Sequence, residues 1–416
     1  MYKSVVSIDR KKWILLFLLL GSVSIGVSQE KTIIYSPDVE TFNYILGTQT
    51  FAPSYQFTDQ TELVETAQAI YDMGSNILKT ALAMNKFSDM KGEFSSLVDI
   101  AQEEPSFQKV LDMDFTYYHL WVYPVDPVPA VFYNGLTQTE ADNEYRQLYD
   151  LTTYLLSAYS NTGKLFYLGN WEGDWHLYYH FDISKPVPAA AVKGMIDWYN
   201  IRQKAIDDAK ATTEYTGVDV WHYAEIALTN TGNKEDLVTV ASHVLPYTNI
   251  DYVSYSTYDV TRALHTYRDM KKELTSALNW VENLLPPKSD ISGKRVWIGE
   301  YGYPFGRNPG NVDPKTPAEQ DLFARNVMRV GLEWGAPFIL WWEMYNNEVK
   351  DGRQLGFWLI DDKGATQPIY HTHYNFYQHG KAYVAKFLKN NGRVPKAVSY
   401  THLRAHETLR YLVCRL

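Results

Sequence analysis

Eight apolar, strand-like segments alternate with longer amphipathic segments, and this alternation limits the possible folds more than any other feature of the sequence. Two of the amphipathic segments, residues 61–74 and 318–335, close on a glycine, as helices often do. Strands that are apolar throughout are typical of a parallel sheet covered on both faces. Eight such strand–helix units predict a (β/α)₈ barrel. The predicted strands are residues 43–51, 76–83, 115–124, 164–172, 218–228, 251–259, 295–304 and 337–344.

An open, doubly wound α/β sheet is the main alternative fold. Such a sheet usually carries a glycine-rich phosphate-binding turn after its first strand. Here the first strand runs into "GTQTFAPSYQF", which has no such turn. We therefore predict one barrel domain over residues 29–397, about 370 residues, which is a normal length for this fold. Its last helix is expected over residues 370–389.

The N-terminus has the pattern of an export signal. Lys3, Arg10, Lys11 and Lys12 precede an apolar core over residues 13–20, and small residues follow as far as Ser28. The apolar stretch is shorter than the roughly 20 residues of a membrane span. We predict a signal peptide over residues 1–28 and a mature protein that is periplasmic or extracellular, with no stable membrane association. An uncleaved anchor is the alternative.

The C-terminal segment, residues 398–416, does not match the rest of the chain. It is basic, contains Cys414, the only cysteine, and follows "NNGRVPK". It resembles translated sequencing-adapter read-through, and a genuine C-terminal helix is the alternative. Without this segment, neither a disulfide framework nor thiol chemistry is expected.

Charge and composition narrow the class of partner. The net charge is −9 and the basic residues are scattered, so no nucleic-acid footprint is apparent. Aromatic residues make up 15% of the chain, with 12 Trp and 33 Tyr. Aromatic rings in such numbers either fill a core or stack on flat ligands.

Acidic and aromatic residues gather where the predicted strands end, which is where barrel enzymes place their active sites. The fourth strand runs into "LGNWEGDW", and the seventh strand ends at Glu300. Because side chains alternate along a strand, we expect Leu168, Asn170 and Glu172 to share one face. The same alternation places Val296, Ile298 and Glu300 together, so that the two glutamates would face each other across the barrel mouth. Glycoside hydrolysis needs such a carboxyl pair.

These strand ends resemble the retaining (β/α)₈ glycoside hydrolases of clan A. "WIGEYGYP" is similar to their seventh-strand nucleophile motif, "GNWEGDW" to their fourth-strand acid/base motif, and "FILWWEMYNNE" to the eighth strand that supplies a tryptophan platform. The resemblance spans residues 43–389 and points to the clan without assigning a family. It implies Glu300 as the nucleophile and Glu172 as the acid/base, with a carbohydrate substrate and no cofactor. The usual fourth-strand motif places Asn immediately before the acid/base Glu, whereas here Trp171 separates Asn170 from Glu172. Asp174 is therefore the second candidate for the acid.

Four residues are candidates for substrate binding: Asn170, His222, Tyr255 and Trp342. Tyr255 is predicted to hydrogen-bond the nucleophile and Trp342 to stack on a sugar, and barrel packing is the alternative for both. His222 and Glu225 are three residues apart on one strand, so they do not share a face, and ordinary hydrogen bonding is the simpler interpretation.

Neither a metal site nor a nucleotide site is predicted. The two close histidine pairs, His176 with His180 and His371 with His373, have no acidic or cysteine partner at a matching spacing. No Walker motif or GxGxxG is present. The sequence therefore predicts an exported retaining β-glycoside hydrolase that acts on a poly- or oligosaccharide. A catalytically silent carbohydrate-binding barrel, an inverting hydrolase and a transglycosylase are the alternatives.

Overall fold

A computed structural model describes residues 35–126, 132, 134–178, 181–235, 237–305 and 313–395 of this chain. The predicted signal peptide, residues 1–28, and the segment 398–416 lie outside the described residues.

Eight parallel strands close into a barrel in sequence order, with β1 paired to β8. Each predicted strand contains one of them, so the (β/α)₈ prediction is confirmed. The observed strands are shorter than predicted at their C-terminal ends, where the chain turns into the loops. The strands are β1 (Leu46–Gln49), β2 (Ile77–Leu82), β3 (Tyr117–Val122), β4 (Leu165–Gly169), β5 (Asp219–Ile226), β6 (Tyr252–Ser256), β7 (Val296–Tyr301) and β8 (Ile339–Trp341).

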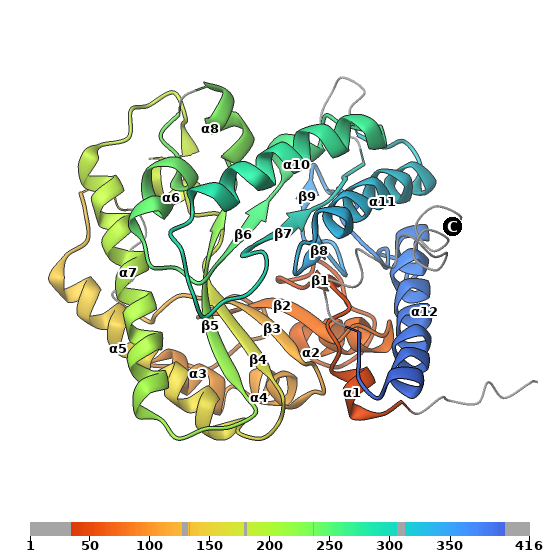
Figure 1. The fold of residues 1–416 in the computed structure, drawn as a ribbon, viewed down its shortest axis with the longest axis horizontal. Helices are drawn as coiled ribbons and strands as arrows, with labels where there is room; N and C mark the ends of the chain where they lie inside the picture. The colour runs from red at the N-terminus through yellow and green to blue at the C-terminus, as the bar shows by residue number, and fades with distance from the viewer. Residues whose placement is uncertain are drawn as a thin grey trace, which may run out of the picture. The chain divides into compact units, whose positions relative to one another are not determined.

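Helices surround the barrel strands (Figure 1). The predicted helix over residues 318–335 is α11, which ends on Gly335 in the left-handed conformation (φ 86°) that glycine adopts without steric cost. The predicted final helix is α12. The longer helices are α2 (Glu62–Asp72), α4 (Pro105–Asp112), α5 (Gln138–Ala158), α7 (Ala189–Thr212), α10 (Tyr267–Leu284), α11 (Pro317–Trp334) and α12 (Pro368–Asn391).

Short elements complete the loops. They are α1 (Pro37–Glu40), α3 (Leu97–Glu103), α6 (Asp174–Leu177), α8 (Thr229–Glu235), a π-helical turn (Val240–Val244), a 3₁₀ turn (Leu245–Tyr247), α9 (Tyr258–Thr261) and a small hairpin of β9 (Val349–Lys350) and β10 (Arg353–Gln354). Within the described ranges, no helix combines the length and apolarity that a membrane crossing requires.

The barrel interior is filled with aromatic rings. Tyr167, Trp297 and Phe338 come from three different parts of the barrel, and their ring centroids lie 5.3–5.6 Å apart. The His119 ring stacks on Tyr167 at 4.7 Å within the same cluster. Such contacts between strands across the barrel are possible only in its interior, so the barrel is a packed core at the level of these rings.

Candidate active site

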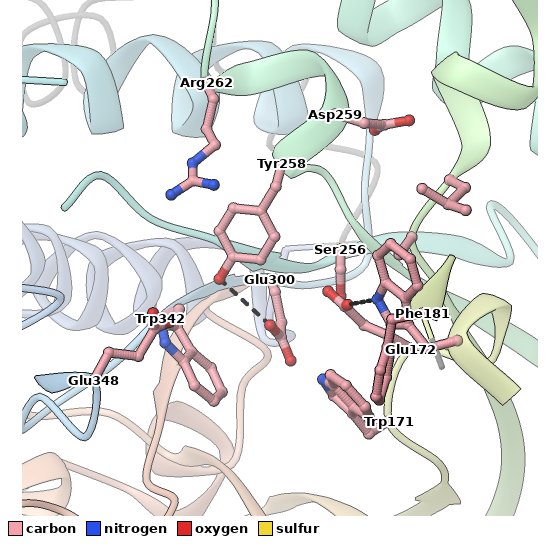
Figure 2. A pocket seen from close by; sticks show the side chains of 13 residues that line it. Trp171, Glu172, Phe181, Ser256, Tyr258, Asp259, Arg262, Glu300, Trp342 and Glu348 are labelled. Atoms are coloured by element: carbon pink, nitrogen blue, oxygen red, sulfur yellow. Dashed lines mark hydrogen bonds between the residues drawn. The ribbon is translucent and has the colours of Figure 1, made fainter. Parts of the chain in front are cut away.

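A cavity of about 400 Å³ opens beyond the carboxyl ends of the strands. Residues at the carboxyl ends of β6 and β7 and in the segments that follow β4, β5, β6 and β8 line it, as expected for the functional end of a barrel. Figure 2 shows Glu172 and Glu300 in this one cavity, between indole rings. The lining residues are Trp171, Glu172, Trp175, Phe181, Ala227, Leu228, Ser256, Tyr258, Asp259, Arg262, Glu300, Trp342 and Glu348.

Glu300 reaches the cavity through a β-bulge in β7. Tyr255 of β6 pairs with Ile298, and the next residue, Ser256, already pairs with Glu300, so Gly299 is an extra residue. The prediction that Ile298 and Glu300 share the inner face was therefore wrong. Ile298 and Val296 pack in the outer core between strands and helices, and the bulge turns Glu300 inward.

Glu172 lies beyond the end of β4 and owes its direction to the loop. Leu168 packs in the outer core, whereas Tyr167 points into the barrel. The predicted sharing of one inner face by Leu168, Asn170 and Glu172 was thus also wrong, because the strand ends at Gly169 and the alternation stops there. The Glu172 carboxyl accepts a hydrogen bond from the Trp175 indole (Figure 2).

The surroundings of Glu172 favour its neutral form. The side chain is 8% exposed. Burial, followed by the nearby Glu225 carboxylate, raises the pKa of Glu172 to about 8, against the Trp175 hydrogen bond and Lys79. A carboxyl group with this pKa carries a proton at neutral pH, as a general acid must.

Asp174, the second candidate for the acid, is fully buried and is not among the residues that line the cavity. Its Oδ2 accepts hydrogen bonds from the backbone N–H groups of Ala227 (2.8 Å) and Leu228 (3.3 Å), and its Oδ1 accepts one from Val240 (2.8 Å). These contacts tie the loop after β4 to the loop after β5. Asp174 thus has a structural position, whereas Glu172 lines the cavity.

A buried lysine joins two carboxylates at the cavity floor. Lys79 Nζ, on β2, lies 2.6 Å from Glu225 Oε2 on β5 and 3.1 Å from Glu300 Oε1. Burial raises the pKa of Glu300 well above its usual range, the Lys79 ammonium opposes this shift, and the carboxylates of Glu225 and Glu172 add to it. Neither Lys79 nor Glu225 was predicted as a site residue. The available signal was Lys79 itself, the one charged residue in the predicted strand "NILKTALA".

The tyrosine that contacts Glu300 is Tyr258. Its hydroxyl donates to Glu300 Oε2 at 3.3 Å (Figure 2). Tyr255, predicted for this role, packs in the outer core and donates its hydroxyl hydrogen to Asp259. That part of the prediction was wrong because Tyr255 points outward on β6, whereas Tyr258 follows the strand end and turns over the cavity.

Asn170 and His222 also lie behind the cavity wall. Asn170 is fully buried, and its amide exchanges hydrogen bonds with the backbone of Glu225 and donates to the Trp171 carbonyl. His222 accepts a hydrogen bond from Arg202 Nε of α7 at 3.2 Å. Both were predicted to bind substrate, and the structure places both among supporting contacts because their side chains face the helices.

Trp342 lines the cavity as predicted, and other rings support it. Phe51 stacks on Trp342 with centroids 5.3 Å apart, and Trp121 stacks on Phe51 at 3.9 Å. An indole backed in this way presents a rigid flat face, which suits the apolar C–H face of a sugar ring.

The described histidine pair, His371 and His373, shows no arrangement for a metal. His371 lies beside the Thr366 hydroxyl, whereas the ring of the buried His373 bonds to the Ile369 carbonyl. His180 lies outside the described residues, so the pair with His176 is not placed. In the described part of the chain, no three His, Cys, Asp or Glu side chains gather as metal ligands.

Solved structures of glycoside hydrolases share this fold. A family 39 glycoside hydrolase from Bacteroides cellulosilyticus is 13% identical, with a TM-score of 0.50 over 83% of this chain and 65% of that chain. An exo-β-1,4-mannosidase from an Opitutaceae bacterium is 12% identical, with a TM-score of 0.53 over 81% of this chain and 60% of that chain. A family 5 lichenase from Caldicellulosiruptor is 13% identical, with a TM-score of 0.50 over 83% of this chain and 96% of that chain.

These likenesses concern the fold. Families 39 and 5 belong to clan A, so the resemblance drawn from the strand ends is confirmed for the barrel. This chain spans less than two thirds of the length of the first two structures. No family model matches the sequence, and no curated protein matches it.

Proposed function

We propose that this protein is a retaining β-glycoside hydrolase that cleaves a poly- or oligosaccharide by double displacement. The observation that carries the proposal is the pair Glu172 and Glu300, which come from opposite sides of the barrel and line one cavity between indoles. Their direct contacts differ as the two roles require, since Glu172 accepts a hydrogen bond from the neutral Trp175 indole and Glu300 contacts an ammonium group.

In the first step, the Glu172 carboxyl gives its proton to the glycosidic oxygen while a Glu300 carboxylate oxygen attacks the anomeric carbon. The C–O bond to the leaving group breaks, and a glycosyl ester forms on Glu300. Positive charge develops on the sugar in the transition state. The Glu300 carboxylate, and the Glu172 carboxyl as it loses its proton, stabilise this charge electrostatically.

In the second step, Glu172 is ionised and takes a proton from water, and the water oxygen attacks the anomeric carbon. The ester bond to Glu300 breaks, and both carboxyl groups return to their starting states. The two inversions leave the β configuration unchanged, and the cycle needs no cofactor.

Two alternatives share the same cavity. A carbohydrate-binding barrel without activity would use the indoles to bind a sugar. Such a protein would gain no binding from Lys79 buried beside two carboxylates, and the burial of these charges costs desolvation energy. An inverting hydrolase would use the same glutamates with a wider separation and would release the opposite anomer.

A substrate panel tests the proposal. The purified protein is incubated with fluorogenic β-glycosides and with polysaccharides whose products are identified by mass spectrometry, with Glu300→Gln as the control. We expect turnover by the wild type only, and the first product seen by ¹H NMR to be the β anomer. An α product would establish inversion, and binding without turnover on the whole panel would favour the silent barrel.

We also propose that the protein is exported, on the basis of the basic and apolar pattern of residues 1–28. Expression of the full chain in a bacterial host, followed by fractionation and N-terminal sequencing, tests this. Mature protein outside the cytoplasm that begins at Gln29 is the expected result, and full-length protein in the membrane fraction would indicate an anchor.

A further inference from the structure

Lys79, Glu225 and Glu300 form a buried charge cluster at the base of the cavity, made by β2, β5 and β7. Lys79 and Glu225 are fully buried, and Glu300 is 2% exposed. Ser254 of β6 donates its hydroxyl hydrogen to Glu225 Oε2 at 2.7 Å. Four strands thus contribute to one polar unit directly beneath the proposed nucleophile.

The cluster also fixes the bulge that directs Glu300. Lys79 Nζ donates to the Gly299 carbonyl at 3.1 Å, one residue before Glu300. A Cβ atom on Gly299 would lie 1.7 Å from Ser254 Oγ, so only glycine fits this position. Lys79 therefore holds both the backbone and the carboxylate of the nucleophile strand.

The cluster has one cation for two carboxylates, and this ratio has a consequence for catalysis. When Glu300 becomes a glycosyl ester, it loses its negative charge. A buried ammonium group left without a counter-ion is strongly unfavourable. Glu225 lies 2.6 Å from Lys79 and outside the cavity lining, so no covalent step of the cycle involves its carboxyl group.

We infer that Glu225 is the permanent counter-ion of Lys79, and that the pair positions Glu300 and allows its charge to disappear as the glycosyl ester forms. The inference rests on the proposed function. Lys79 and Glu225 are positioning residues, because they act through Glu300. When the ester forms and Glu300 loses its charge, Glu225 remains as the counter-ion of Lys79.

Other charged or titratable groups also face this cluster. Glu172 faces it from the loop after β4, Tyr258 from α9, and Glu343 and Lys86 from the loops after β8 and β2. Tyr223 faces it from β5 and His119 from β3. They remain in place in the variants below, so the expected shifts come from Lys79 and Glu225 alone.

The first test needs no substrate. The protein is labelled with ¹³C at the glutamate side-chain carboxyl carbons, the Glu300 signal is assigned with Glu300→Gln, and its titration is followed by NMR. In Glu225→Gln, the apparent pKa of Glu300 should fall by about 1–3 units because a like charge is removed. In Lys79→Met it should rise by a similar amount. Unchanged titration in both variants would overturn the inference, whatever the substrate.

The second test uses the kinetics of activated aryl glycosides, for which kcat/KM reports formation of the ester. In Glu225→Gln, ester formation leaves Lys79 unpaired, so kcat/KM should fall on the order of 10²-fold. The double variant Lys79→Met/Glu225→Gln removes the unpaired charge and should be more active than Glu225→Gln alone. Additive losses in the double variant would overturn the inference.

Lys79→Arg is the matched control, since it keeps the charge and should keep the Glu300 titration near that of the wild type. If Lys79→Met fails to fold, the charge-neutral double variant and Glu225→Gln still decide the matter. Absence of wild-type turnover on any glycoside would refute the proposed function, whereas the NMR titration would still decide whether Lys79 and Glu225 set the charge of Glu300.

Discussion

The two sides of the cavity each present a glutamate, but the two carboxyl groups contact different kinds of neighbour. On the β4 side, a loop carries Glu172, and the hydrogen bond to its carboxyl comes from the neutral Trp175 indole. On the β7 side, the strand itself carries Glu300, whose two oxygens contact the Lys79 ammonium and the Tyr258 hydroxyl. Burial raises the pKa of both carboxyl groups, whereas direct contact with an ammonium group favours the ionised form of Glu300, as a nucleophile requires.

The largest effect is expected on the β7 side. Glu300→Gln preserves size but removes the nucleophilic carboxylate, so turnover of every glycoside should fall by roughly 10⁴-fold or more. Stopped and continuous assays with both activated and natural substrates measure this. A variant that keeps a tenth of its activity would place the nucleophile elsewhere.

On the β4 side, the loss of Glu172 should slow some substrates much more than others. Glu172→Ala should slow substrates with poor leaving groups by about 10²–10⁴-fold and activated aryl glycosides far less, because only a poor leaving group needs the proton. Added azide should yield a β-glycosyl azide, since the ester still forms on Glu300. Equal losses for both kinds of leaving group would remove Glu172 from the acid role.

The pH dependence sharpens the same contrast. The acid works only while protonated, so kcat/KM for poor leaving groups should fall as the pH rises through about 8, the pKa of Glu172. In Glu172→Ala this alkaline limb should disappear. Its persistence in the variant would assign the limb to another group.

A smaller effect separates the two tyrosines of the β6 end. Tyr258→Phe removes the hydrogen bond to Glu300 and should lower kcat/KM by roughly tenfold, the range of one hydrogen bond to a charged group. Tyr255→Phe, its matched control, removes a hydroxyl that donates to Asp259. The control should leave kcat/KM within about twofold of the wild type and change only thermal stability.

The smallest effect on chemistry is expected from Asp174. Asp174→Asn weakens a carboxylate that holds three backbone N–H groups, so the free energy of unfolding should fall by about 1–3 kcal/mol. Differential scanning calorimetry measures the lower melting temperature. The rate ratio between good and poor leaving groups should not change, and a selective loss would make Asp174 the acid.

Much of the site was predictable because it follows from strand order. The acids after β4 and β7 had to meet at one end once the eight strands closed, so Glu172, Glu300 and Trp342 were found as cavity residues. The assignments that failed all depended on which face a side chain takes. Tyr255, Asn170 and His222 were assigned by proximity to a strand end, and their side chains face the helices.

The sequence by itself determined the barrel, because apolar strands and amphipathic helices repeat eight times and each helix must cover a strand. It also determined which end carries the acids. Only the tertiary structure decided how the acids point, since one extra residue, Gly299, reverses the alternation and no sequence pattern marks it. Likewise, Lys79, Glu225 and Glu300 come from distant strands, and only closure of the barrel places one ammonium group between the two carboxylates.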